Sequence, residues 1–277
     1  MLGRCRRRVL VCDRGEPRNA RSAALHGYLT RDGIAPAEFR DAARRELVPY
    51  GIELRCISVQ NARREQNTFR VRLANGHVER SRFLLLATGV HDELPPVEGV
   101  SECYGRSVFH CPYCDGWEWR DRRLAVLGHK GVPLALSLKT WSDTVVLFAN
   151  GGRVDASARG RLARNGVEVR PEKVARLAHD NGFVRAMVLT NGDRVTCDAV
   201  FFTTGQYQQH SLAERLGCMF TRKGTVNTGT LCETNVSAVF VAGDASRDAQ
   251  FVIVAAAEGV KAAMAINQAL QRQELRR

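Results

Sequence analysis

The segment Phe83-Leu84-Leu85-Leu86-Ala87-Thr88-Gly89 decides the fold of this 277-residue chain, because its pattern occurs twice. It is an apolar run of strand length that ends in a threonine–glycine pair. Val200-Phe201-Phe202-Thr203-Thr204-Gly205 repeats it, with 116 residues from the first glycine to the second. Continuous apolar runs of this kind are typical of strands buried on both faces of a parallel sheet. We interpret the repeat as two related nucleotide-binding domains, the second inserted in the first.

Expected strands and helices alternate along the rest of the chain. The patterns predict strands at 8–12, 53–59, 68–73, 78–82, 124–127, 144–148, 167–170 and 239–241, and helices at 36–48, 133–140 and 251–270. The pair Asn191-Gly192 predicts a hairpin turn, and Pro95-Pro96 indicates a crossing between domains. This alternation is typical of layered α/β proteins.

The segment His110-Cys111-Pro112-Tyr113-Cys114-Asp115-Gly116 carries the chemistry. Two cysteines three residues apart lie within bridging distance, and such loops lower one thiol pKa from about 8.5 to between ~3.5 and 7.5. The imidazole of His110 can add positive charge, and Asp115 can give a proton to a leaving thiolate. A zinc site would need a second ligand pair, which the sequence does not contain, so no metal is expected.

Composition limits the class of protein. No apolar run approaches the roughly 20 residues of a membrane span, and no signal-peptide core is present. Nine cysteines in a chain of this length do not suggest a disulfide scaffold, so a cytoplasmic location is expected. The net charge of +12 comes mostly from scattered arginines without a basic stripe. This pattern does not favour nucleic acid, but it is compatible with acidic partners.

Together, the motifs resemble one family. The ordered set Ala87-Thr88-Gly89, the Cys111–Cys114 motif, a glycine turn at Gly128, Thr234-Asn235-Val236 and Ala242-Gly243-Asp244 is similar to low-molecular-weight thioredoxin reductases, which are flavoproteins. The Cys-Pro-x-Cys form also resembles a branch that includes dithiol oxidases of disulfide-containing natural products. The resemblance implies a homodimer and two Rossmann-like domains. Residues 1–100 and 226–277 would bind FAD, and the inserted residues 101–225 would bind NAD(P)H and carry the cysteines.

The resemblance also implies roles for single residues. Cys114 would exchange electrons with the flavin, Cys111 would attack the substrate disulfide, and Asp115 would be the general acid. The substrate would be a thioredoxin-like protein or a small disulfide or dithiol. The implied cofactor contacts are Asp13 at the adenosine ribose, Thr88 and Gly89 at the dinucleotide, Asp244 at the ribityl chain, Gln250 and Phe251 at the flavin edge, and Gly128 and Gly131 at the NAD(P)H turn.

Two departures from the family pattern leave alternatives open. A ribose-binding acid normally follows a G-x-G-x-x-G turn by about 20 residues, whereas only 12 residues precede Asp13. The first βα unit is therefore expected to be missing, which would leave neighbouring strands unpaired and weaken FAD binding. In the inserted domain Lys130 replaces a glycine of the expected turn, and no acid follows residues 144–148. The sequence therefore leaves open whether the electron donor is NADPH, NADH or another reductant. A dithiol oxidase that uses oxygen and a non-enzymatic redox-sensing fragment are the alternatives to a reductase.

Overall fold

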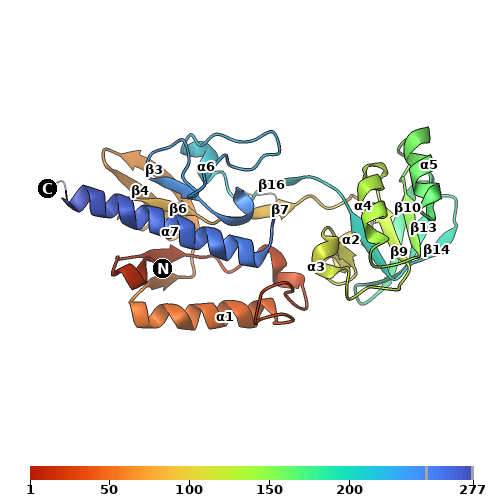
Figure 1. Cartoon of the computed structure of the whole chain (residues 1–277), viewed down its shortest axis with the longest axis horizontal. Coiled ribbons are helices and arrows are strands. Elements are labelled where there is room, and N and C mark those ends of the chain that lie inside the picture. Colours follow the sequence, from red (N-terminus) through yellow and green to blue (C-terminus); the bar gives the residue numbers. More distant parts are fainter. Residues whose placement is uncertain (247–248, 276–277) are drawn as a thin grey trace. The chain divides into compact units, whose positions relative to one another are not determined.

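The structure is a computed structural model of the chain, and it describes residues 1–246 and 249–275. It divides into two compact units (Figure 1). Unit 1 comprises Met1–Ala20, Gly27–His91 and Gln206–Arg277, and unit 2 comprises Arg21–His26 and Asp92–Gly205. The nested order agrees with the inserted-domain interpretation of the repeat. The chain changes unit at 91/92 and 205/206, whereas the sequence placed the boundaries at 100/101 and 225/226.

The boundary residues lie in a short pair of strands. β7 (Val90–Asp92) pairs with β16 (Gln206–Gln208) in a two-stranded sheet. Pro95 and Pro96 therefore lie inside unit 2 and not at the crossing. A proline pair marks a break in regular structure, but the contacts of the flanking strands decide which unit a residue joins.

Unit 2 is built on a five-stranded parallel sheet. Its order is β11 (Val167–Arg170), β10 (Val145–Phe148), β9 (Leu124–Leu127), β15 (Ala199–Phe202) and β8 (Val108–Phe109). Every residue of β9 and β15 is buried, which explains their continuous apolar sequence. The chain runs from β9 to β10 and β11 on one side, while β15 and β8 lie on the other. Parallel sheets bind nucleotides outside the carboxyl ends of the strands at such a reversal.

Helices and a second, antiparallel sheet complete unit 2. α4 (Val132–Leu138) follows β9, and α5 (Ala156–Arg164) follows β10. The antiparallel strands are β12 (Val174–Asp180), β13 (Phe183–Leu189) and β14 (Arg194–Thr196), and β13 and β14 form the hairpin predicted at Asn191-Gly192. The short helices are α2 (Val100–Cys103) and α3 (Pro112–Asp115).

Unit 1 contains two pairs of parallel strands and a three-stranded antiparallel sheet. β1 (Leu10–Cys12) pairs with β2 (Glu53–Arg55), and β17 (Val239–Val241) pairs with β6 (Leu84–Leu86). Within the described residues these four strands form separate pairs and no larger sheet. The antiparallel sheet consists of β3 (Val59–Glu65), β4 (Thr68–Leu73) and β5 (Val78–Ser81).

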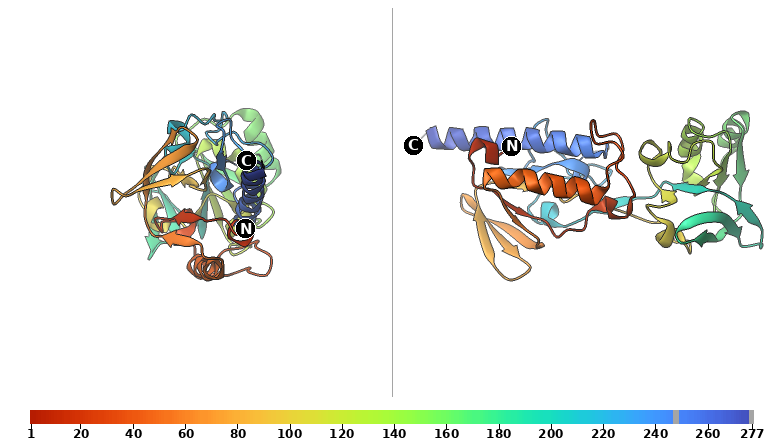
Figure 2. Two further views of the ribbon diagram at one scale, coloured as in Figure 1. Left: turned by 90° about the vertical axis from the view of Figure 1, so that its left-hand side faces the viewer. Right: turned by 90° about the horizontal axis from the view of Figure 1, so that it is seen from below.

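The helices of unit 1 differ greatly in length. α1 (Pro36–Leu47) and α7 (Val252–Leu275) are its two long helices, and α6 (Leu212–Arg215) is a single turn (Figure 2). Small residues let α7 pack closely: Ala262 and Ala263 are buried, and Ala262 packs in one cluster with Cys232 and Phe240. No helix in 1–246 or 249–275 combines the length and apolarity that a bilayer crossing requires. The same ranges hold no group of three or more His, Cys, Asp or Glu arranged for a metal.

Candidate active site

Cys111 and Cys114 form a disulfide in unit 2, with their Cα atoms 5.4 Å apart. Cys111 is extended and caps α3, and Pro112 begins the helix, where its missing N–H costs nothing. This turn brings the two sulfur atoms together. The other seven cysteines carry free thiols, so this is the single disulfide of the described residues.

Aromatic side chains surround the disulfide turn. The Tyr113 ring packs edge-on against Trp141 at 5.5 Å, and Gly116 has no room for a Cβ because the Trp141 ring lies 2.9 Å from that position. Tyr113 is 73% exposed and Trp117 is 64% exposed. Trp117 lies at the surface, whereas Trp119 packs against the ring of Phe109 in the core.

Asp115 has an unusual acidity. The pKa of its carboxyl is raised from 3.8 to about 7, chiefly by burial and to a smaller extent by the negative charge of Glu118, while the imidazole of His26 acts in the opposite direction. His26 Nε2 lies 3.4 Å from Glu118 Oε1. Asp115 can therefore hold or release a proton at neutral pH, as a general acid must. Sequence reasoning missed Glu118, although its spacing of three from Asp115 was a usable signal.

A second polar cluster lies in unit 1, beside the start of α7. Arg18 donates from Nη1 to Asp244 Oδ2 at 3.0 Å and to Gln250 Oε1 at 2.6 Å. Gln206 and Gln250 exchange two amide hydrogen bonds of 3.0 and 2.7 Å. The structure thus brings together Asp244 and Gln250, both predicted from the sequence. It adds Arg18 and Gln206, which no spacing indicated.

Gly243, next to Asp244 of this cluster, forms a hydrogen bond with Glu258 of α7. Its φ of +77° favours glycine, and its N–H donates to Glu258 Oε2 at 2.7 Å. A Cβ at this position would lie 3.3 Å from Ala255 Cβ. Glu258 is only 5% exposed. Phe251 accepts a hydrogen bond from Ala255 N at the beginning of the helix. Glu258 was missed as well, although an acid in an alanine-rich helix was a signal.

The remaining expected nucleotide contacts lie at strand ends. Asp13 directly follows β1; its Oδ1 accepts from Gly15 N at 2.9 Å and its Oδ2 lies 3.4 Å from Arg44 Nη2. Thr88 and Gly89 follow β6, and Gly89 has a φ of +69°. The carboxyl ends of parallel strands are where dinucleotides bind in this class of fold.

The polar groups of unit 1 fit the flavin half of FAD. The carboxylate of Asp244 and the amide of Gln250 suit hydroxyl and ring partners, and the guanidinium of Arg18 suits a phosphate. Arg18 holds Asp244 and Gln250 together at this point.

The glycine turn of unit 2 lies after β9, at the reversal of strand order. Gly128 has a φ of +104° and donates to Phe148 O at 2.8 Å. Gly131 is buried against the side chain of Val126, so no larger residue fits. Lys130 is exposed in this turn, and Asn150, Gly151 and Gly152 follow β10 where an acid would bind an NAD ribose.

Comparison with known proteins agrees with this arrangement. The family model described as "Pyridine nucleotide-disulphide oxidoreductase" matches residues 11–259. The chain belongs to this family. It is 29% identical to a "Probable thioredoxin reductase" of Arthroderma benhamiae over 89% of this chain and 70% of that protein. Among solved structures, the crystal structure of HlmI is 36% identical in sequence with a TM-score of 0.96. The match covers 99% of this chain and 88% of the HlmI chain.

A further solved structure supports the same conclusion. A putative thioredoxin reductase TrxB from Bacillus anthracis is 28% identical, with a TM-score of 0.94 over 99% of this chain and 93% of that chain. The expected fold of two dinucleotide-binding domains is confirmed. The resemblance to thioredoxin reductases and the flavin-dependent oxidoreductase function are confirmed with it. The family uses FAD and a nicotinamide cofactor.

Proposed function

We propose that this thioredoxin reductase-like flavoenzyme passes electrons from a nicotinamide through FAD to Cys111 and Cys114, and from them to a substrate disulfide. The observation that carries the proposal is the Cys111–Cys114 disulfide directly followed by a carboxyl whose pKa is about 7. Structural disulfides have no use for such a neighbour. Thiol–disulfide exchange does, because each step releases a thiolate that is stabilised by protonation.

The two cysteines would act in sequence on the substrate. In the reduced pair, the Cys111 thiolate attacks one substrate sulfur, which forms a mixed disulfide and releases the other substrate sulfur as a thiolate. Cys114 then attacks Cys111, which restores the Cys111–Cys114 bond and releases the second substrate thiolate. Asp115 supplies a proton to the first departing thiolate, and it regains a proton from the Cys114 thiol as that thiol becomes the attacking thiolate. When bound, FAD supplies the ring that carries two electrons between a nicotinamide and this pair.

Residues of both units would hold the cofactors. We propose that Asp13, Thr88, Gly89, Asp244, Gln250 and Phe251 contact FAD, together with Arg18, which pairs with Asp244 and Gln250. Gly128 and Gly131 would contact the nicotinamide nucleotide. NADPH is proposed over NADH because residues 149–152, directly after β10, contain no carboxylate, while Arg153 offers a cation there. The next acid, Asp155, accepts a hydrogen bond from Ala158 N and caps α5. The exposed rings of Tyr113 and Trp117 beside the disulfide suit a thioredoxin-like protein or a small disulfide as substrate. By family resemblance, we propose a cytoplasmic homodimer.

The test begins with the purified full chain and added FAD. Stopped-flow absorbance follows flavin reduction by NADPH and by NADH, and a thiol-reactive chromogenic disulfide and thioredoxin serve as oxidants. We expect disulfide reduction in the parent protein and none in Cys111→Ser or Cys114→Ser, with flavin binding retained in both. Flavin binding with equal activity in the serine variants would contradict the proposal. Oxygen consumption with a small dithiol, and no reduction of either disulfide, would instead identify a dithiol oxidase.

A further inference from the structure

The outer face of the β3–β4–β5 sheet carries a row of like charges. Arg63 of β3 lies directly opposite Arg70 of β4, and Arg70 lies directly opposite Arg80 of β5. On β4 the alternate residues Phe69, Val71 and Leu73 point to the opposite face of the sheet, where they are buried in the core. Like charges directly opposite in a sheet are destabilising. The repulsion within the row therefore lowers the stability of the fold, and a bound anion would reduce that repulsion.

Neutralisation within the chain is incomplete. Among the described residues, Glu65 is the acid that contacts the row: its carboxylate lies 2.8 Å from Arg63, 3.1 Å from Arg80 and 3.9 Å from Arg70. In the next row, Arg72 lies opposite Asn61. Arg72 is exposed and forms no ion pair with any residue in 1–246 or 249–275. Three guanidinium groups thus share one carboxylate, and the guanidinium of Arg72 adds a fourth positive charge.

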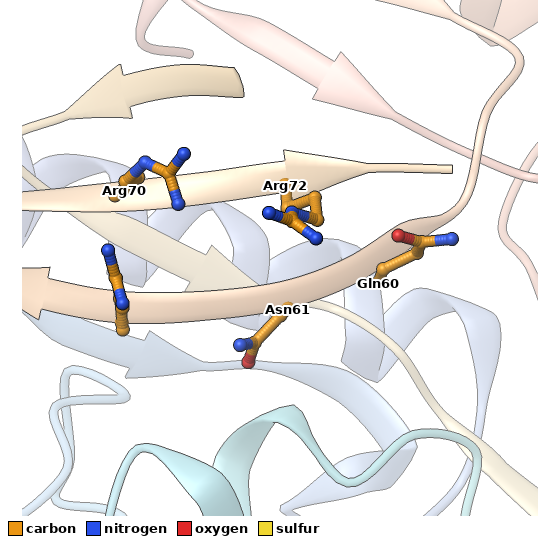
Figure 3. Close-up of a pocket in the computed structure, with 5 residues that line it drawn as sticks. Gln60, Asn61, Arg70 and Arg72 are labelled. Atoms are coloured by element: carbon orange, nitrogen blue, oxygen red, sulfur yellow. The ribbon is translucent and has the colours of Figure 1, made fainter. Parts of the chain in front are cut away.

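A hollow opens over these side chains. It has a volume of about 320 Å³ and is lined by Gln60, Asn61, Arg63, Arg70 and Arg72 (Figure 3). Figure 3 shows Arg70 and Arg72 on one strand, with Gln60 and Asn61 on its neighbour. The pairing of β3 with β4 shifts register between Val59 and Asn61. Such an irregularity redirects side chains, and here it lies next to both amides of the hollow.

The chemistry of the lining selects the ligand. Each guanidinium offers up to five N–H donors in a planar fork, and the two amides add further donors. A carboxylate has two oxygens, whereas a phosphate presents three or more around a tetrahedral centre to donors from different directions. We propose that this hollow is a binding site for the phosphate group of a small ligand. Glu65 holds the side chains of the row in place through its ion pairs. Arg72 and the amides of Gln60 and Asn61 would donate hydrogen bonds to the anion.

This site stands apart from the cofactor residues. None of its lining residues belongs to the clusters assigned to FAD, to the nicotinamide nucleotide or to the disulfide. The proposal therefore does not rest on the proposed function, and a catalytically inactive chain would bind phosphate equally well. The positive charge of the protein also admits an acidic protein partner, which the test below distinguishes.

The experiment is isothermal titration of the full chain, with FAD and NADP⁺ present in excess to occupy the cofactor sites. Inorganic phosphate and pyrophosphate are the probes, and sodium chloride holds the ionic strength constant. We expect saturable binding that weakens at least about tenfold in Arg70→Gln and in Arg72→Gln, because a charge-assisted contact is lost. The matched control is Arg185→Gln in unit 2, which removes an arginine with a 67% exposed side chain and leaves binding unchanged.

Thermal unfolding supplies a second readout. Without phosphate, Arg70→Gln should unfold at the same or a higher temperature than the parent, because repulsion in the row is relieved. Phosphate should raise the unfolding temperature of the parent and of Arg185→Gln, but not of Arg70→Gln. An absence of saturable binding, or equal weakening in Arg185→Gln, would overturn the proposal. Binding of an acidic peptide that depends on Arg70 and Arg72, without binding of phosphate, would also overturn it in favour of a protein partner.

Discussion

Replacement of Asp115 by asparagine tests the role of its shifted pKa. Asparagine has nearly the same shape but carries no acidic proton. We expect Asp115→Asn to slow the opening of the Cys111–Cys114 disulfide by dithiothreitol, because the departing thiolate loses its proton source. General acid–base assistance of this kind is worth about 10²- to 10⁴-fold in rate. The size of the loss should depend on pH in a way that the structure predicts.

The pH dependence follows from the fraction of Asp115 that is protonated. With a pKa of about 7, that fraction is about one half at pH 7, about a tenth at pH 8 and about a hundredth at pH 9. The concentration of attacking dithiothreitol thiolate is the same for both proteins at each pH, so it cancels in the ratio of their rates. The ratio of parent to variant should therefore be nearly constant below pH 6 and fall tenfold per pH unit above pH 8.

The assay is straightforward because the described residues contain one disulfide. Free thiols released at increasing times are counted after acid quenching, from pH 5 to pH 9. Asp143→Asn, at a fully exposed carboxylate on the same unit, is the matched control and should follow the parent curve. A parent-to-variant ratio that is flat across this range, or one that already falls tenfold per pH unit between pH 5 and pH 6, would refute the reasoning.

Three further changes test other parts of the structure. Glu118→Gln removes a negative charge that raises the pKa of Asp115, so the break in the same rate profile should move to lower pH. Gly243→Ala places a Cβ 3.3 Å from Ala255 at a φ of +77°, so absorbance titration should show weaker FAD binding and calorimetry a lower unfolding temperature. Ser107→Ala leaves the buried N–H of Val184 without its acceptor. Denaturant unfolding should therefore show a decrease of about 1–3 kcal/mol in the free energy of unfolding, and a decrease below about 0.5 kcal/mol would contradict this role.

Much of the secondary structure could be predicted because it depends on local sequence. The helix expected at 36–48 is α1 (Pro36–Leu47), and the helix expected at 251–270 is α7 (Val252–Leu275). The hairpin at Asn191-Gly192 was predicted for the same reason, since a two-residue turn of this composition has few other conformations. The unit boundaries were placed less well. They depend on contacts between β7 and β16, which are more than a hundred residues apart in the sequence.

The sequence by itself determined the two parallel-strand segments that end in Thr-Gly and the close approach of Cys111 and Cys114. Both depend on neighbours a few residues apart, whose geometry the backbone dictates. Only the tertiary structure decided the pKa of Asp115, the meeting of Arg18 with Asp244 and Gln250, and the row of arginines on β3, β4 and β5. Burial, long-range pairing and strand register are properties of the folded chain, because residues far apart in the sequence come into contact only when it folds.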